Sequence, residues 1–142
     1  MPLLPKERWR GGWHRGNADY MDLALPASKV LEFRRQAQAI CAGSGVGIHE
    51  YALWGGPELY SMVITRAAVA SDPNDLASFR EVSDSLRRLV QDMGGSMEYC
   101  HGIGLRLLHL AEREWGSGLE AARHIKQALD PYGIMNPGKL GL

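Results

Sequence analysis

The chain has 142 residues, of which 45% are apolar and 23% charged, and its formal net charge is zero. This length suits one domain with a modest core, and the balanced charge provides no global field that would recruit nucleic acid or an anionic membrane. No apolar run approaches the roughly 20 residues of a membrane span, and only two cysteines are present, so we expect no membrane segment, no signal peptide and a reducing, cytoplasmic setting.

The first predicted region is an irregular arm over residues 1–18. Trp9, Arg10, Trp13 and Arg15 lie in it without periodicity. Aromatic and basic side chains together can form a platform for single-stranded nucleic acid. The zero net charge and the lack of aromatic motifs on the predicted strands argue against that function, so we predict no nucleic-acid partner.

A strand and a helix are predicted next. Residues 20–25 alternate between apolar and polar side chains, which is typical of a short strand, and Pro26 closes it. Ser28 is the predicted N-cap of the following helix, which ends at Gly43. The apolar stripe of that helix is predicted to be Val30, Leu31, Ala37, Ile40 and Cys41.

A hairpin and a long helix follow. Residues 45–54 and 59–65 read as two strands, and the Gly-Gly-Pro sequence at 55–57 between them predicts a tight turn. The next helix begins at Ser71–Asn74 and ends at Gly94 and Gly95. Residues 96–100 are predicted to form a fourth short strand. The apolar stripe of the helix is Leu76, Phe79, Val82, Leu86, Leu89, Val90 and Met93.

The order strand, helix, strand, strand, helix, strand is typical of the ferredoxin-like βαββαβ fold, so we predict an α+β domain. In this topology the first and fourth strands are neighbours, and both helices cover one face of an antiparallel sheet. We expect the second face to be uncovered and apolar, and such a face requires a partner. A homodimer that buries it is therefore predicted.

Two C-terminal helices extend this fold. The first is predicted over Leu105–Trp115. The second begins at Ser117, where Ser117 and Glu120 have the spacing of a capping box, and it ends at Asp130 and Pro131. Its predicted apolar stripe is Leu119, Ala122, Ile125 and Leu129. A turn-rich tail then brings the amide of Asn136 close to the ammonium of Lys139.

The segment between the predicted fourth strand and these helices is the main functional candidate. It places His101 in a turn whose glycines, Gly102 and Gly104, can adopt positive φ and approach a ligand closely. An imidazole in such a turn is a candidate acid, base or substrate anchor, with a structural turn histidine as the alternative. Tyr99 is a second candidate, or else a packed strand tyrosine.

The motif His101-Gly102-Ile103-Gly104, the helix pair after it and the ending over residues 129–140 occur in this order in one known family. Together they resemble the C-terminal region of FAD-linked oxidases of the vanillyl-alcohol oxidase superfamily, and residues 23–28 look like the strand-to-helix entry of that region. The superfamily includes glycolate oxidase, D-lactate and D-2-hydroxyglutarate dehydrogenases, and alkyldihydroxyacetonephosphate synthase. The resemblance covers roughly residues 19–142 and implies one cap, or substrate, domain.

In that family the sheet forms the roof over the flavin, and the substrate lies between them. The resemblance therefore implies an oxidoreductase that transfers a hydride from a small hydroxylated, anionic substrate to flavin N5. His101 and Tyr99 are the expected catalytic residues, and Asn136 and Lys139 the expected contacts on the flavin side. Arg106 and His49 are candidates to bind the anionic end of the substrate, with a solvated surface position as the alternative for each.

The chain also departs from the family pattern. The family's Gly-rich pyrophosphate loop is not found, so we expect FAD only with a FAD-binding domain in cis or in trans, and an isolated chain that is inactive. Cys100 stands where hydroxyacid oxidases carry Glu, which leaves the substrate open. The surroundings of His49 do not reproduce the family's metal-supporting pattern, so no metal is predicted. The alternative function is a non-catalytic ferredoxin-like module for oligomerisation or interaction.

Overall fold

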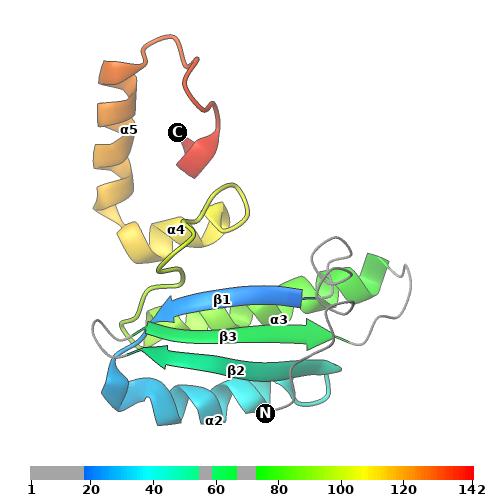
Figure 1. Cartoon of the computed structure of the whole chain (residues 1–142). Coiled ribbons are helices and arrows are strands. Elements are labelled where there is room, and N and C mark those ends of the chain that lie inside the picture. Colours follow the sequence, from blue (N-terminus) through cyan, green and yellow to red (C-terminus); the bar gives the residue numbers. More distant parts are fainter. Residues whose placement is uncertain (1–17, 55–58, 67–72) are drawn as a thin grey trace. The chain divides into compact units, whose positions relative to one another are not determined.

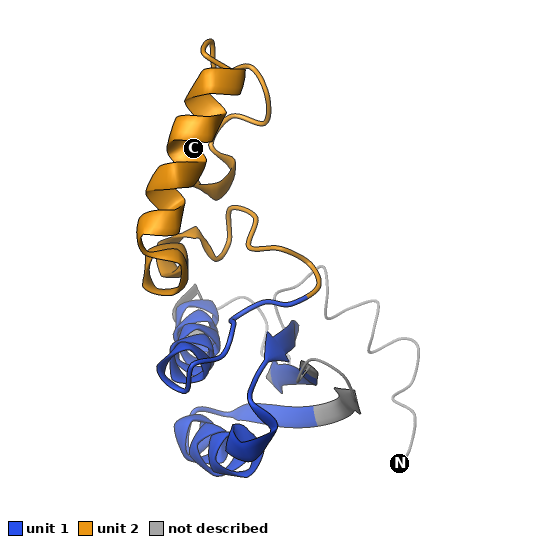
Figure 2. Ribbon diagram, turned by 90° about the vertical axis from the view of Figure 1, so that its left-hand side faces the viewer, with its two compact units in different colours: residues 1–99 blue, residues 100–142 orange. Residues whose placement is uncertain are grey.

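The computed structural model describes residues 18–54, 59–66 and 73–142, so the predicted N-terminal arm and the hairpin turn lie almost wholly outside the described residues. The chain divides into two compact units, which are residues 1–99 (unit 1) and residues 100–142 (unit 2) (Figure 2). The elements in chain order are β1 Ala18–Ala24, η1 Ala27–Lys29, α2 Val30–Cys41, β2 Val46–Trp54, β3 Leu59–Arg66, α3 Pro73–Asp92, α4 Leu108–Trp115, α5 Ser117–Leu129 and η2 Lys139–Gly141 (Figure 1).

Unit 1 contains an antiparallel sheet with the strand order β1-β3-β2. The hairpin prediction is confirmed, because β2 and β3 pair from Trp54 and Leu59 back to Val46 and Arg66. The pairing shifts register between Glu50 and Ala52, which is a β-bulge. This register decides which side chains of β2 lie on each face of the sheet.

The predicted fourth strand is reduced to a single bridge. Ser96 pairs with Ala24 through two backbone hydrogen bonds, from Ser96 N to Ala24 O at 2.8 Å and from Ala24 N to Ser96 O at 3.1 Å. The Tyr99 N–H donates to the Asp22 carbonyl at 2.7 Å. The segment therefore runs along the free edge of β1, where a ferredoxin-like fold has its fourth strand, and the predicted α+β class is confirmed.

Both helices of unit 1 lie on the same side of the sheet (Figure 2). The core lies between these two helices and the sheet. It combines alternate residues of β1 and β3 with one stripe from each helix. The rings of Phe33 and Tyr60 meet edge to face, with centroids 5.6 Å apart. The core includes Met21, Leu23, Leu25, Phe33, Ala37, Tyr60, Met62, Ile64, Phe79, Val82, Leu86 and Val90.

The predicted start and stripe of α2 are partly wrong. Ser28 lies inside η1, the N-cap residue of α2 is Lys29, and no side chain caps the helix. Leu31 is 75% exposed, whereas Phe33, which the predicted stripe omitted, is 0% exposed. The buried residues of α2 follow a spacing of three and four residues from Val30, and Leu31 lies off that line.

The expectation of an apolar second face is also wrong for the side chains that are described. Alternation and register put Tyr20, Asp22, Ser61, Thr65 and His49 on the face opposite the helices, around Val63. Asp22 and Ser61 are buried there, and His49 is exposed. A largely polar face gives no hydrophobic reason for the predicted homodimer, which stays untested.

A buried ion pair joins β1 to α3 on the helix side of the sheet. Arg87 Nη1 lies 2.8 Å from Asp19 Oδ2, and both side chains are at most 2% exposed. The Ser83 hydroxyl also donates to the Asp19 carboxylate. A buried pair is a poor source of net stability because both charges lose water, but leaving one charge without the other costs several kcal/mol. The pair therefore constrains how α3 can pack on β1.

Unit 2 contains the two predicted C-terminal helices. Gly116, with φ 48°, joins α4 to α5, and no side chain caps either helix, so the predicted capping box is wrong. The tail returns to α4, since a Cβ at Gly141 would lie 3.0 Å from Leu108 Cδ1. Leu107, Leu110, Ala111 and Leu119 are buried. Leu105, before α4, is exposed, and so are five residues of α5 and the tail that we call the exposed apolar group of unit 2: Ile125, Leu129, Tyr132, Ile134 and Met135.

Among the described residues, no helix combines the length and the apolar character that a membrane crossing requires. Cys41 and Cys100 are both free thiols, and burial raises the pKa of the Cys41 thiol.

Candidate functional site

Two adjacent glycines at the end of α3 direct the chain toward the candidate residues. Gly94 has φ 78° and Gly95 N donates to Val90 O at 2.9 Å, while Gly94 N donates to Gln91 O at 3.0 Å. These two bonds form a Schellman motif, in which a left-handed residue ends the helix. The predicted glycine stop is confirmed, and it turns the chain toward the edge of β1.

Gly95 has a separate role, which is to allow close approach. A Cβ at Gly95 would lie 2.3 Å from Ala24 O and 2.7 Å from Val90 Cγ1, closer than side-chain carbons come to such atoms. Only glycine therefore allows the chain to pass between β1 and α3 at this point. Met97, which is 0% exposed, then anchors the segment in unit 1. Tyr99 follows with its side chain 48% exposed.

His101 lies at the start of unit 2 with its side chain exposed. Gly102 has φ 71° and Gly104 has φ 52°, so both glycines adopt the predicted left-handed conformation. Ile103 between them is 6% exposed, and its carbonyl accepts a hydrogen bond from Leu107 N at 3.1 Å. The turn is thus fixed through Ile103 while the imidazole before it stays accessible.

His49 lies on the face of the unit 1 sheet opposite α2 and α3, and its side chain is exposed. Its Nε2 lies 3.0 Å from Thr65 Oγ1, across the β2–β3 pairing. Val63 of β3 is flanked by His49 on one side and by Tyr20 on the other. The imidazole of His49 and the phenol of Tyr20 thus lie in one row across this face. Both groups can form hydrogen bonds with a polar ligand.

Asp22 and Ser61 form the next row of the same face. The Ser61 hydroxyl donates to Asp22 Oδ1, and the two side chains are buried. Sequence reasoning did not select either residue. The alternation of β1 was visible, but the partner of Asp22 lies 39 residues away and depends on strand register.

The other predicted site residues lie in unit 2. Arg106 is exposed and precedes α4. Asn136 has φ 47°, and its carbonyl accepts a hydrogen bond from Lys139 N at 3.2 Å, so the backbone brings these two residues together. The six predicted site residues therefore divide between the units, with Tyr99 and His49 in unit 1. Their roles stay predictions.

Asp130 organises the tail, which sequence reasoning did not foresee. Its carboxylate accepts hydrogen bonds from Ile134 N and Met135 N, each at 2.9 Å, and from the Lys126 ammonium. Lys126 Nζ also donates to Met135 O at 2.7 Å. The Lys126 ammonium and these backbone N–H groups hold the pKa of Asp130 below its ordinary value. The lysine four residues before Asp130 was the available sequence signal.

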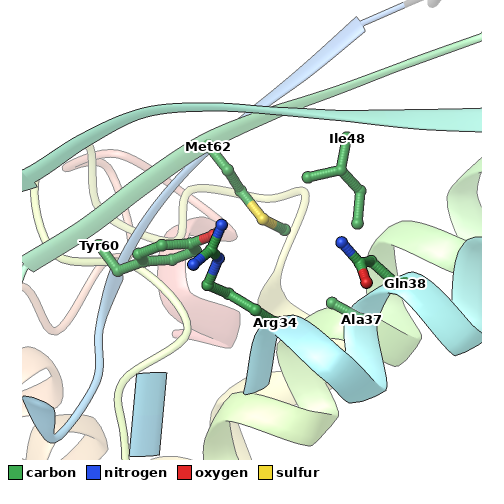
Figure 3. Close-up of a pocket in the computed structure, with 6 residues that line it drawn as sticks. All are labelled: Arg34, Ala37, Gln38, Ile48, Tyr60 and Met62. Atoms are coloured by element: carbon green, nitrogen blue, oxygen red, sulfur yellow. The ribbon is translucent and has the colours of Figure 1, made fainter. Parts of the chain in front are cut away.

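A small cleft lies on the other side of the sheet, between α2 and the strands β2 and β3. Figure 3 shows Arg34 extending toward Tyr60 and Gln38 beside Ile48, with Met62 between the strands and the helix. Its volume is about 250 Å³, below the roughly 300–1,000 Å³ of most small-molecule sites. We assign no function to it.

Known proteins are similar in sequence to both units of this chain. Residues 3–140 match the family described as FAD linked oxidases, C-terminal domain. The D-2-hydroxyglutarate dehydrogenase of Pseudomonas putida is 28% identical over 119 residues, which are 84% of this chain and 11% of that protein. The D-lactate dehydrogenase of Archaeoglobus fulgidus is 26% identical over 122 residues, 86% of this chain and 26% of that protein.

A third relative, the alkyldihydroxyacetonephosphate synthase of Trypanosoma brucei brucei, is 38% identical over 71 residues, 49% of this chain and 12% of that protein. The chain thus spans about a tenth to about a quarter of the length of these curated relatives. The resemblance seen in the His101 turn and in the tail is confirmed across both units. The chain belongs to the family of C-terminal domains of FAD-linked oxidases, which it matches over residues 3–140.

Proposed function

We propose that this chain supplies the substrate side of a FAD-dependent oxidoreductase that acts on a small hydroxylated, anionic substrate. The family match supports the oxidoreductase class, and two of the three relatives named above are dehydrogenases of D-2-hydroxyglutarate and D-lactate, which are 2-hydroxy acids. The observation that carries the proposal is the accessible imidazole of His101 in a glycine-flanked turn that Ile103 fixes.

The residues of this chain fit a role toward the substrate. In the proposed reaction His101 takes or holds the hydroxyl proton, and Tyr99 assists as a hydrogen-bond donor. Arg106 or His49 holds the anionic end, because a guanidinium and an imidazole can each donate to carboxylate oxygens. Bound FAD would supply the hydride acceptor at N5.

The partner in this proposal is a FAD-binding domain, in cis or in trans, and Asn136 and Lys139 are the proposed contacts on its side. The exposed apolar group of unit 2 supports a protein partner at the tail, where Tyr132 is 88% and Ile134 78% exposed. Asp130 holds the backbone of Ile134 and Met135 in place, so binding there costs less conformational entropy. The cytoplasmic setting stays a proposal based on the two free thiols.

Anaerobic reduction of flavin tests this function. The chain, joined to its FAD-binding domain, is mixed with D-lactate, D-2-hydroxyglutarate or glycolate, and bleaching of the oxidised flavin is recorded. We expect at least one 2-hydroxy acid to reduce the flavin, and the corresponding amide, which lacks the negative charge, to reduce it poorly. If flavin binds but no hydroxy acid reduces it, the proposed substrate class is wrong.

The same exposed apolar group also favours the alternative, a non-catalytic oligomerisation module. Light scattering on the 142-residue chain separates the two functions when combined with the variants Leu129→Ser and Ile134→Ser. An oligomerisation module that associates through this apolar group should dissociate in these variants. A monomeric wild type that gains mass only with a FAD-binding domain supports the cap function instead.

A further inference from the structure

Thr65 lies beside the candidate substrate anchor His49, although it was not a candidate itself. The two residues lie on neighbouring strands, in the register that pairs His49 with Val63 and Gly47 with Thr65. Thr65 is thus a diagonal neighbour of His49, within reach of a ring side chain. The 3.0 Å separation of His49 Nε2 and Thr65 Oγ1 is that of a hydrogen bond.

This bond decides which ring nitrogen a ligand can use. A neutral imidazole has one N–H donor and one acceptor nitrogen, and a threonine hydroxyl can donate or accept. With Nε2 engaged by Thr65, the nitrogen left for a ligand is Nδ1, which has no hydrogen-bond partner within the described part of the chain. To bind a carboxylate, Nδ1 must carry a proton, and the Thr65 hydroxyl can then donate to Nε2.

Gly47, which pairs with Thr65 on the neighbouring strand, does not crowd the His49 ring. A Cβ at Gly47 would lie 3.6 Å from His49 Nε2 and 3.7 Å from Thr65 Oγ1, which is ordinary van der Waals contact. The orientation of the ring is therefore not imposed by crowding from Gly47. Among the described residues of this sheet, the Thr65 hydroxyl is the group that hydrogen-bonds to the ring.

We propose that Thr65 is a positioning residue, which holds the His49 ring so that Nδ1 is presented to the carboxylate of the substrate. The ligand half of this inference rests on the proposed function, whereas the effect of Thr65 on the ring does not. A threonine at this position supplies both the β-branched shape that suits a strand and the hydroxyl that fixes the imidazole.

Nitrogen NMR of the 142-residue chain tests the effect on the ring directly. Thr65→Val keeps the shape and removes the hydroxyl, so we expect the ¹⁵N shifts of His49 to move toward a different mixture of tautomers. Thr65→Ser restores the hydroxyl and should return the wild-type shifts. Gly47→Ala, which adds a methyl at contact distance, should leave them unchanged, as should the signals of His124 in every spectrum. Identical His49 shifts in Thr65→Val and wild type would overturn the proposal.

Kinetics of the assembly with its FAD-binding domain test the ligand half. Because an anchor for a carboxylate binds ground state and transition state alike, Thr65→Val should raise KM roughly threefold to tenfold and leave kcat nearly unchanged. Thr65→Ser should recover most of the loss. An unchanged KM overturns the anchoring role. If no 2-hydroxy acid turns over in wild type but the NMR result holds, the proposed function fails while the positioning of the ring by Thr65 stands.

Discussion

Helices α3 and α5 carry similar apolar stripes, yet they bury them very differently. In α3, Phe79, Val82, Leu86 and Val90 are all at most 8% exposed. In α5, Leu119 is 5% exposed, but Ile125 is 61% and Leu129 76% exposed. Because a sheet and a second helix lie against α3 within unit 1, its stripe is covered there. In the stripe of α5, Leu119 is buried and Ala122 is half-buried, whereas the last two residues are left exposed and available to a partner.

The first way to sharpen this comparison is to break the buried charge pair of unit 1. Asp19→Ala leaves the buried Arg87 without its carboxylate, so we expect a loss of about 3–5 kcal/mol in the free energy of unfolding. Arg88→Ala removes solvent-accessible pairs with Glu81 and Asp84 and is the control, with an expected change of about 0–1 kcal/mol. Urea denaturation measures both. Equal losses would mean that the burial of the pair is unimportant.

The second prediction compares the two stripes directly. Leu86→Ala removes a side chain that is 0% exposed and should lower stability by about 2–5 kcal/mol. Leu129→Ala, at 76% exposure, should change it by less than about 0.5 kcal/mol. Thermal unfolding of the chain without a partner gives both values. A large loss in Leu129→Ala would show that α5 buries its stripe in the free chain.

The third prediction separates the two glycines after α3. Gly95→Ala forces a methyl against Ala24 O, so we expect a loss of roughly 1–3 kcal/mol and faster hydrogen exchange at the Ser96 and Tyr99 amides. Gly94→Ala meets nothing within 4 Å and should cost about 1 kcal/mol, from its positive φ alone. If Gly95→Ala leaves both amides protected, close approach at Gly95 does not hold the segment on β1.

The smallest expected effect concerns the tail. Because the folded pKa of Asp130 is lowered, its stabilising contribution is present above the unfolded carboxyl pKa of about 3.9 and is lost as pH falls through the lower folded value. Exchange at the Ile134 and Met135 amides should therefore accelerate below about pH 4. Asp130→Asn should remove this pH dependence. A tail whose amides exchange at a pH-independent rate, after correction for intrinsic exchange, would exclude the carboxylate as its organiser.

Local patterns in the sequence predicted the elements well, but not the faces of the sheet. If the strand pairing continued from Trp54 and Leu59 without a bulge, His49 would lie opposite Ile64, whose side chain belongs to the core. The bulge after Glu50 shifts the pairing by one residue, so His49 lies opposite Val63 on the face away from the helices. No turn or periodicity signal in the sequence announced that bulge. The partnership of His49 with Thr65 was therefore beyond sequence reasoning.

The turn that contains His101, in contrast, could be predicted from the sequence. The left-handed glycines around His101 could be predicted because the requirement for positive φ is local. The exposure of Leu31, Ile125 and Leu129 could not be predicted, because burial depends on which element or partner packs against a stripe. The site residues named from the family motif likewise needed the resemblance, since spacing alone does not assign a role.

The most direct test of the account is the rate of anaerobic flavin reduction in the assembly of this chain with its FAD-binding domain, compared between wild type and His101→Gln. If His101 takes the hydroxyl proton, the rate with a 2-hydroxy acid should fall about 10²- to 10⁴-fold at unchanged flavin content. The control His124→Gln, on the exposed surface of α5, should react like wild type. Reduction at the wild-type rate in His101→Gln would contradict the account.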